Sequence, residues 1–317
     1  MPTNFASLAN QAGISWLYPT YNEPVPSNNT YPGYIVGAII PKSGSLSSIG
    51  KPVQSSLEKA ESDVNKYFDY YNSSSRVKLI VEDSKTSPQE SLAAIKKLYA
   101  SGARVIVEAA TSTAVSAVLD FANERNITLL SYASTSPELS IGGDNLFRLV
   151  PDDNSQGKVI AEKMIGDGIK VIVPFWRSDI YGNELANATK YYFEKLGGNV
   201  EEGVNYEPHT GKFATSLHRI NFIMWNQELK KMNTMVSDAI TKYGKESVGV
   251  YIISYDEITP ILIQAQLFDD LGKVRWYGSD SIAENHHQKK YRISEFRCSN
   301  TIRKSVVFCW DWQPLNT

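Results

Sequence analysis

Short apolar runs rich in β-branched residues alternate with longer amphipathic stretches along most of the chain. Such runs are typical of buried strands, whereas apolar residues spaced by three and four positions predict helices. The first half of the chain contains five predicted strands, at 34–40, 77–81, 105–107, 127–130 and 147–150. Predicted helices separate the first four of them, at about 52–71, from Ser87 to Gly102, and over the repeat of Val115, Val118, Leu119 and Ala122.

The same alternation begins again at Lys170. Strands are predicted at 171–175, 204–206, 248–253 and 274–277, and helices at 155–164, about 183–196, over much of 213–243 and at about 259–271. Strand–helix–strand repeats favour parallel sheets, because the chain has to cross back over the sheet between parallel strands. Two such series, joined near 149–154, predict an α/β protein with two lobes.

We therefore expect an irregular leader at 1–33, lobe 1 at 34–150, lobe 2 at 151–280 and an atypical tail at 281–317. The tail has no clear α/β period, and it holds both cysteines of the chain, Cys298 and Cys309. Spacing alone does not establish a disulfide between them. The abrupt change favours a translated wrong frame or an artificial junction, and an ordinary divergent terminus is the alternative.

Small hydroxyl residues follow two neighbouring predicted strands, in EAATSTA at 108–114 and in YASTSPEL at 132–139. The carboxyl ends of parallel strands meet at one edge of a sheet, where ligands bind. Hydroxyls and free backbone N–H groups at helix N-termini suit a carboxylate or another small anion. These segments contain no nucleophile–base pair and no metal ligands, so they predict binding of something small and not a reaction with it.

Composition and charge narrow the class of protein. The chain has 317 residues, 42% hydrophobic and 21% charged, with a net charge of -2, which is ordinary for a soluble globular protein. Without a cluster of Lys and Arg we expect no nucleic-acid partner. No apolar run approaches the roughly 18 residues of a membrane-spanning helix, and residues 1–31 show no secretory apolar core. The chain is expected to be cytoplasmic, or else a mature or truncated form of an exported protein.

Motifs of known chemistry are missing. There is no phosphate-binding glycine loop, no nucleophile elbow and no HExxH pair, and His209 and His218 have no metal-ligand spacing. The acidic pairs at 82–83 and 256–257 follow predicted strands, and we interpret them as helix-capping residues before catalytic acids. We expect no enzyme activity, no metal and no cofactor.

Six segments resemble, in the same order, the type I periplasmic binding proteins of the leucine/isoleucine/valine-binding branch. They are PKSGSLSSIG at 41–50, VIVEAATSTAV at 105–115, LLSYASTSPEL at 129–139, FRLVPDDNSQG at 147–157, RSDIYGNEL at 177–185 and VRWYGSDS at 274–281. The resemblance covers residues 34–281. It implies a two-lobed fold in which each lobe is a mainly parallel sheet flanked by helices, a three-layer αβα arrangement, with the ligand enclosed between the lobes by hinge closure.

The resemblance also implies site residues. Ser112 would grip the α-carboxylate of the ligand. Ala133 and Thr135 would supply backbone and hydroxyl contacts to the carboxylate and the ammonium. Tyr181 and Tyr255 would close over the ligand from lobe 2, and Asp280 would pair with its ammonium.

Two departures from the family pattern stand out. Only 37 residues follow Asp280, whereas family members continue and cross back to complete lobe 1, so lobe 1 is expected to lack its returning strands. The segment 212–233, which contains Trp225, resembles an insertion.

The resemblance implies the extracellular or periplasmic solute-binding component of an ABC importer. It would act as a monomer, bind a branched-chain amino acid or a similar small zwitterion or amide, and deliver it to a membrane permease. The alternatives are a ligand-sensing receptor domain of the same fold, an enzyme on an α/β scaffold, and a truncated copy without function.

Overall fold

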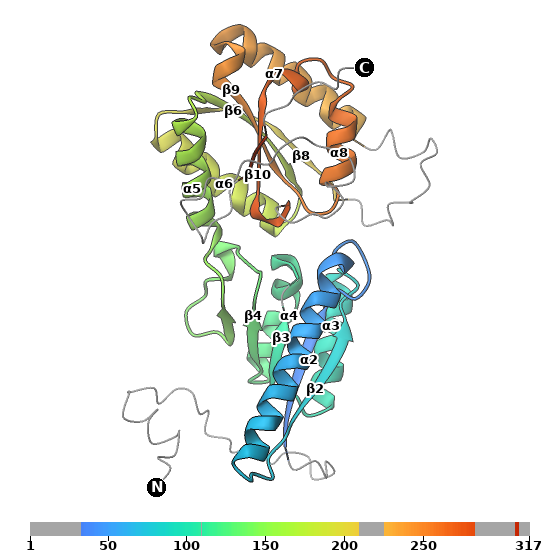
Figure 1. Cartoon of the computed structure of the whole chain (residues 1–317). Helices are drawn as coiled ribbons and strands as arrows, with labels where there is room; N and C mark the ends of the chain where they lie inside the picture. The colour runs from blue at the N-terminus through green and yellow to red at the C-terminus, as the bar shows by residue number, and fades with distance from the viewer. Residues whose placement is uncertain (1–32, 109, 209–224, 283–307, 311–317) are drawn as a thin grey trace.

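The computed structural model describes residues 33–108, 110–208 and 225–282, together with the backbone of 308–310. Two lobes stack one above the other, and the segment after β5 leads from the first into the second (Figure 1). The predicted leader except residue 33, the first part of the helix expected at 213–243 and most of the predicted tail lie outside the described residues.

Lobe 1 is built on a five-stranded sheet in which every neighbouring pair is parallel. The strand order is β2-β1-β3-β4-β5. The strands are β1 (Tyr34–Ile40), β2 (Val77–Asp83), β3 (Val105–Glu108), β4 (Thr128–Ser131) and β5 (Leu146–Arg148). The helices are α2 (Ser47–Tyr70), α3 (Pro88–Ala100) and α4 (Ser112–Glu124).

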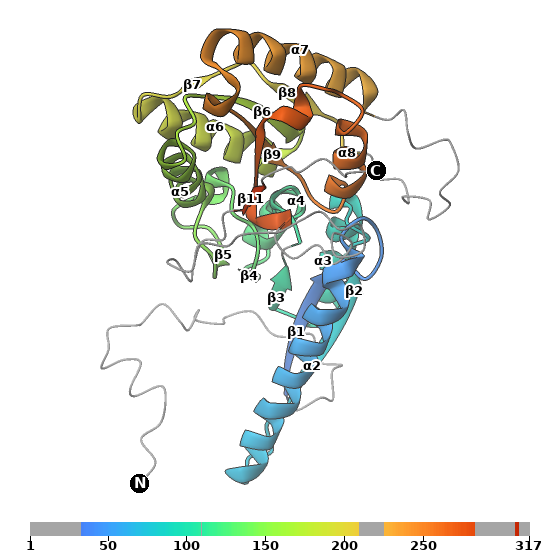
Figure 2. The same cartoon turned by 45° about the horizontal axis from the view of Figure 1, so that its top comes forward.

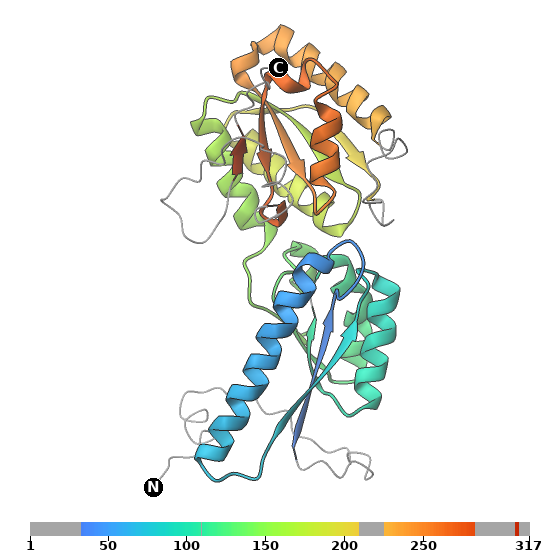
Figure 3. The ribbon, with the colours of Figure 1, turned by 45° about the vertical axis from the view of Figure 1, so that its right-hand side comes forward.

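The two faces of the lobe-1 sheet are covered differently. Helices α3 and α4 bury one face in a core that includes Ile95, Leu98, Val115 and Val118 together with Ile106 of β3. The long helix α2 crosses the opposite side of the sheet (Figure 3), and of its residues only Gly50 is buried. The order helix, sheet, helix confirms the three-layer arrangement for this lobe.

Local signals explain how α3 and α4 begin. Ser87 precedes α3 in an extended conformation and its side chain accepts a hydrogen bond from the N–H of Glu90, while Pro88 occupies the first helical position. Thr111 caps α4 in the same way, accepting from the N–H of Ala114 at 3.0 Å. Both caps place the helix N-termini directly after the carboxyl ends of strands.

Lobe 2 contains a six-stranded sheet of order β11-β10-β9-β6-β7, with β8 paired to β6. The strands are β6 (Val171–Arg177), β7 (Asn199–Val200), β8 (Val204–Tyr206), β9 (Val248–Ile253), β10 (Arg275–Gly278) and β11 (Phe308–Trp310). All pairs are parallel except β10 with β11. The helices are α5 (Asp153–Gly166), α6 (Ile180–Lys195), α7 (Asn226–Tyr243) and α8 (Ile258–Ala265).

Alternate residues of the central strands of lobe 2 enter two separate cores. Val173 of β6 and Val250 of β9 pack with α7 and α8, whereas Ile172 and Tyr251 pack with α5 and α6. Successive side chains of a strand point to opposite faces, so both faces of this sheet are buried. Figure 2 shows α7 lying across the sheet on the side away from α5 and α6.

Some predicted boundaries were wrong. Helix α2 begins at Ser47 and not near residue 52, because Gly50 lets the first turn approach the Pro41 carbonyl, which a Cβ would meet at 2.1 Å. Helix α6 begins at Ile180 and not near 183, which places Tyr181 in its first turn. Helix α8 ends at Ala265, before the predicted 271, and the two-residue strand β7 was not predicted.

The lobes touch one another. Leu46 and Ala110 of lobe 1 belong to the same buried apolar cluster as Tyr181 and Tyr255 of lobe 2. A polar contact adds to this, since the Ser48 hydroxyl donates to Oδ2 of Asp256 at 2.9 Å. The carboxyl ends of the strands of both sheets therefore face one interface.

Candidate ligand-binding site

The lobe-1 side of the interface consists of the loops that follow β3 and β4. Ser112, the first residue of α4, is buried, and its Oγ accepts a hydrogen bond from the N–H of Ser136 at 3.3 Å. This bond ties the N-terminus of α4 to the loop that carries Ala133 and Thr135. Because the first N–H groups of a helix have no partner within it, this position can receive a carboxylate.

The loop after β4 is held by its own short hydrogen bonds. Ser131 accepts from the N–H of Ser134 at 3.1 Å. Thr135 is buried, and its carbonyl accepts from the N–H of Asp153 at 2.9 Å. Ala133 is half-buried in the same loop. The structure thus brings Ser112, Ala133 and Thr135 into one small region.

On the lobe-2 side, Tyr181 and Tyr255 form a stacked pair whose ring centroids lie 5.3 Å apart at an interplanar angle of 8°. The Tyr181 hydroxyl donates to Oδ1 of Asp280 at 2.8 Å and lies 2.9 Å from Oγ of Ser281. Burial, followed by the nearby Asp280 carboxylate, raises the pKa of Tyr181, so its hydroxyl keeps its proton and acts as a donor. The three lobe-2 residues predicted from the resemblance therefore lie together.

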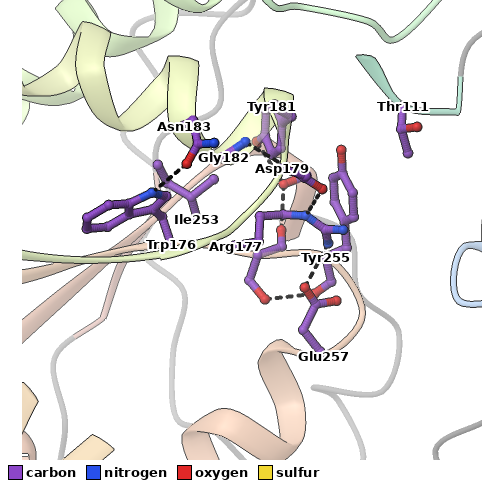
Figure 4. Close-up of polar contacts among 12 residues, drawn as sticks. Thr111, Trp176, Arg177, Asp179, Tyr181, Gly182, Asn183, Ile253, Tyr255 and Glu257 are labelled. Carbon is purple, nitrogen blue, oxygen red and sulfur yellow. Dashed lines mark hydrogen bonds and ion pairs between the residues drawn. The ribbon is translucent and has the colours of Figure 1, made fainter. Parts of the chain in front are cut away.

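A buried arginine fixes the position of Tyr255 (Figure 4). The guanidinium carbon of Arg177 lies 3.6 Å from the centroid of the Tyr255 ring, and its NH1 donates to Oε1 of Glu257 at 2.7 Å. Its Nε pairs with Oδ2 of Asp179 at 2.5 Å. The two carboxylates neutralise the guanidinium, so Arg177 positions the tyrosine and leaves no free positive charge for a ligand.

Asp179 also organises the start of α6. Its side chain accepts from the N–H of Gly182 at 2.9 Å and caps the helix. Gly182 is required there because a Cβ would lie 2.0 Å from the Arg177 carbonyl oxygen. Thr111 lies on the lobe-1 side of this group in Figure 4. Together, the Arg177 contact, the Asp179 cap and Gly182 fix the first turn of α6, which carries Tyr181.

The electrostatic character of the site is anionic. Asp280 keeps an exposed surface, yet the protein that surrounds it desolvates the carboxylate and raises its pKa. Asp153, at the start of α5, is fully buried, and burial followed by the charges of Asp280, Asp152 and Glu184 raises its pKa to about 7. The hydroxyl of Thr135 offsets part of this shift. A cation would be stabilised here more than an anion.

Three residues that shape the candidate site were not predicted as part of it. Arg177 lay in a recognised segment without a role, and Asp153 was interpreted only as part of the crossover between lobes. Glu257 occupies the N-cap position of α8 without a capping hydrogen bond and pairs with Arg177 instead, so its interpretation as a capping residue was wrong. Asp256 bonds to Ser48 of lobe 1. The Arg177–Glu257 and Ser48–Asp256 contacts join residues 80 and 208 positions apart. A local sequence pattern cannot predict contacts over such separations.

The described residues contain no group of three or more His, Cys, Asp and Glu placed to hold a metal ion. Among the helices of the described residues, none is both long and apolar enough to cross a membrane.

Residues 34–221 match the family described as "Periplasmic binding protein". The chain belongs to the periplasmic binding protein family. The match confirms the family predicted from the six segments. The matched residues include both loops of the lobe-1 side and the first turn of α6, which carries Tyr181.

Two curated proteins are similar to this chain in sequence. The chain is 28% identical over 256 residues to an uncharacterised protein of Methanocaldococcus jannaschii, covering 79% of this chain and 57% of that protein. It is 26% identical over 182 residues to a Leu/Ile/Val-binding protein homologue of Brucella melitensis, covering 57% of this chain and 48% of that protein. The chain spans about half the length of these curated relatives.

A solved structure supports the fold. The crystal structure of a leucine-binding protein from Thermotoga maritima superposes with a TM-score of 0.59 at 20% identity, over 81% of this chain and 74% of that one. The two-lobed α/β fold expected of type I periplasmic binding proteins is therefore confirmed. The Brucella and Thermotoga proteins are both named as binding proteins.

Proposed function

We propose that this chain is the solute-binding component of an ABC importer and captures an amino acid of the branched-chain type, or a similar small zwitterion, between its lobes. It acts outside the cytoplasmic membrane as a monomer and delivers the ligand to a membrane permease. The Brucella and Thermotoga relatives, whose names state binding of leucine-type amino acids, support the ligand class.

One observation carries the proposal: a position suited to a carboxylate (the carboxylate pole) and a position suited to an ammonium (the ammonium pole) lie on opposite lobes. Lobe 1 offers the N-terminus of α4 with the Ser112 hydroxyl, which suits a carboxylate. Lobe 2 offers Asp280, which suits an ammonium, beside the stacked rings of Tyr181 and Tyr255. A zwitterion bridges these poles and so favours the closed arrangement of the lobes over the open one.

In this proposal each predicted residue has a role. Ser112 and the Thr135 loop hold the carboxylate, with the Ala133 carbonyl available to the ammonium. Asp280 pairs with the ammonium, and the tyrosine pair provides an apolar wall with a polar edge. Among the described residues of the site no nucleophile is held by a base, and the proposed cycle is binding, closure and release without covalent chemistry.

The test is isothermal titration of the purified chain with leucine, isoleucine, valine and small amides. Isoamylamine, which lacks the carboxylate, and 4-methylpentanoate, which lacks the ammonium, are the matched probes. We expect one amino acid to bind and both probes to bind at least a hundredfold more weakly, about 3 kcal/mol, because each leaves one pole unpaired.

Asp280→Asn is the deciding variant, and Asp269→Asn, an exposed acid of the same lobe, is its control. Asp280→Asn should weaken amino-acid binding by about 2–5 kcal/mol, and the control should bind as the unaltered chain does. Equal affinity of the two variants would reject Asp280 as the ammonium partner, and binding of none of the compounds by the unaltered chain would reject the proposed function.

A further inference from the structure

The last turn of helix α2 carries an exposed aromatic surface that the proposed function does not use. Tyr67, Tyr70 and Tyr71 are 61%, 79% and 57% exposed. The ring centroid of Tyr71 lies 4.8 Å from that of Tyr67 and 5.0 Å from that of Tyr70. These three residues form the tyrosine patch. Single exposed aromatic side chains are common on protein surfaces, but a contiguous group of them indicates a surface that binds something.

The residue that follows the tyrosine patch ends the helix in a tight turn. Asn72 has a φ of 52°, in the left-handed region, and its N–H donates to the carbonyl of Asp69 at 3.0 Å. The N–H of Ser73 donates to the carbonyl of Phe68 at 2.9 Å, which completes a Schellman motif. Glycine is the commonest residue at this position and asparagine also occurs there. The turn by itself is therefore satisfied by either residue.

Asn72 also begins an Asn-X-Ser sequence, because Ser74 follows two positions later. This spacing is the acceptor sequence for N-linked glycans. The side chains of Asn72 and Ser74 are exposed, and they belong to a loop between α2 and β2. Short acceptor sequences occur often by chance, so the surroundings decide whether one of them can be used.

The chain contains four Asn-X-Ser/Thr sequences, which begin at Asn28, Asn72, Asn126 and Asn187. Asn28 lies outside the described residues. A glycan transferase has to bind the asparagine and the hydroxyl residue together. Both therefore have to be accessible on the folded chain.

Two of the other sequences do not meet this condition. Asn126 ends α4 in the same kind of turn, with a φ of 51°, but Ile127 is fully buried and Thr128 begins strand β4. Asn187 lies within α6, and its hydroxyl residue Thr189 is buried. Among the described residues, the sequence that begins at Asn72 is thus the one that lies in an exposed loop.

A group attached at Asn72 would not obstruct closure of the lobes. Helix α2 starts at the lobe interface, where Ser48 donates to Asp256 of lobe 2, and runs to the opposite end of lobe 1 (Figure 3). The helix has 24 residues, and at 1.5 Å per residue it spans about 36 Å. The candidate ligand-binding site and the tyrosine patch are therefore at opposite ends of this lobe.

We propose that Asn72 carries an N-linked glycan and that the first sugars of this glycan pack on the tyrosine patch. The C–H face of a sugar ring matches the face of an aromatic ring, and the tyrosine hydroxyls match its polar rim. One attachment accounts for the asparagine, for the serine two positions later and for the exposed rings beside them. Of the proposed function, this inference uses only the location outside the cytoplasmic membrane and not the ligand.

The attachment needs a lipid-linked oligosaccharide, joined to its lipid through phosphate, as the donor. A bond forms between Nδ2 of Asn72 and C1 of the first sugar, and the bond between that carbon and the phosphate oxygen breaks. The lipid phosphate leaves with the electron pair of the broken bond. The amide nitrogen gives up one proton to solvent. The glycan replaces a hydrogen of the side chain without any change of oxidation state.

The experiment is mass spectrometry of the full chain, directed out of a host that glycosylates Asn-X-Ser/Thr by an added export signal. A secreted reporter protein of known glycosylation is produced in the same cells. We expect the intact mass to exceed the sequence mass by a glycan. After digestion, the glycan should be found on the peptide that contains Asn72.

Variants of the acceptor sequence separate the glycan from the turn. Ser74→Ala keeps Asn72 and its turn and should lose the glycan, and Ser74→Thr should keep it. Asn72→Gly should also lose the glycan, and it remains folded because glycine adopts the left-handed conformation. Asn187→Gln is the matched control and should leave the mass of the attached glycan unchanged.

A thermal-melt cycle tests the contact with the tyrosine patch. In the exported chain, Ser74→Ala should lower the melting temperature by about 2 °C or more, because the packed sugars are lost. In the background of Tyr70→Ser with Tyr71→Ser, the same change should have no effect. The chain made without the export signal carries no glycan, and there Ser74→Ala should be neutral.

The outcomes separate this inference from the proposed function. A glycosylated reporter beside a chain without a glycan at Asn72 overturns the inference, whether or not the chain binds an amino acid. An equal loss of melting temperature with and without the two tyrosines overturns the packing on the tyrosine patch. A glycan at Asn72 on a chain that binds no amino acid leaves the inference standing and rejects the proposed ligand.

Discussion

Glu108 tests, without any ligand, whether burial raises the pKa of a carboxyl group in this protein. This residue ends β3 inside lobe 1, and its side chain is fully buried. Burial raises the pKa of its carboxyl from 4.5 to about 8, and the nearby Ser91 hydroxyl offsets only part of the shift. The neighbouring Tyr132 has its own pKa raised by burial and then by the Glu108 charge. Glu108 is therefore protonated at neutral pH in the folded chain and ionised in the unfolded chain.

The sign follows from which state binds the proton. Between pH 4.5 and 8 the folded state holds a proton that the unfolded state has lost, so the free energy of unfolding decreases as pH rises and levels off above pH 8. At 1.36 kcal/mol per pKa unit, the decrease between pH 5.5 and pH 8.0 is about 3 kcal/mol. Glu108→Gln, which resembles the protonated acid and cannot ionise, should abolish this decrease.

The assay is urea unfolding followed by circular dichroism at both pH values. Relative to the unaltered chain, the free energy of unfolding of Glu108→Gln should increase by about 3 kcal/mol between pH 5.5 and pH 8.0. Glu124→Gln, at the exposed end of α4, serves as the control and should show no such gain. If both variants follow the unaltered chain at both pH values, then Glu108 is not held in its neutral form, and the reasoning from burial is wrong.

Three further predictions concern the framework of the site. Arg177→Lys should lower stability by about 3–5 kcal/mol in urea unfolding, because an ammonium cannot satisfy Asp179 and Glu257 in the same forked geometry; stability equal to that of the unaltered chain would contradict this. Gly182→Ala should cost at least about 1–3 kcal/mol in the same assay, since its methyl group meets a backbone oxygen, and a thermal melt like that of the unaltered chain would exclude the close contact. Trp225→Ala should cost about 3–5 kcal/mol, because this fully buried ring packs on Tyr206; Lys231→Ala, an exposed change on α7, should be near neutral by comparison.

Much of the fold follows from the sequence alone. Strands β1 and β9 have the predicted bounds, because uninterrupted apolar runs such as YIVGAII and VGVYII can only be satisfied in the interior of a sheet covered on both sides. The start of α3 was predicted equally well, since Ser87 and Pro88 form a local cap. The limits of α2 and α8 were not, because they depend on contacts with distant residues and not on the local pattern.

The same distinction between local features and long-range contacts applies to the candidate site. Loops rich in hydroxyls after strands are a local feature, and the six residues carried over from the family lie at the facing edges of the two sheets. The ion pair of Arg177 with Glu257 joins residues far apart in the sequence, and the Asp280 charge likewise raises the pKa of the distant Asp153. Only the folded chain brings these charges together, so the electrostatics of the site could not be predicted from spacing.

The apolar contact of Leu46 and Ala110 with the tyrosine pair also bears on how long a ligand stays bound. A ligand held between the lobes can leave only after this contact separates. In the proposed cycle of binding and closure, the ligand would enter before this contact forms. The contact therefore contributes to the barrier for dissociation and not to the rate of encounter. Residence time in this protein would then depend on Leu46 and Ala110, two side chains at the lobe interface to which the proposed function assigns no ligand contact.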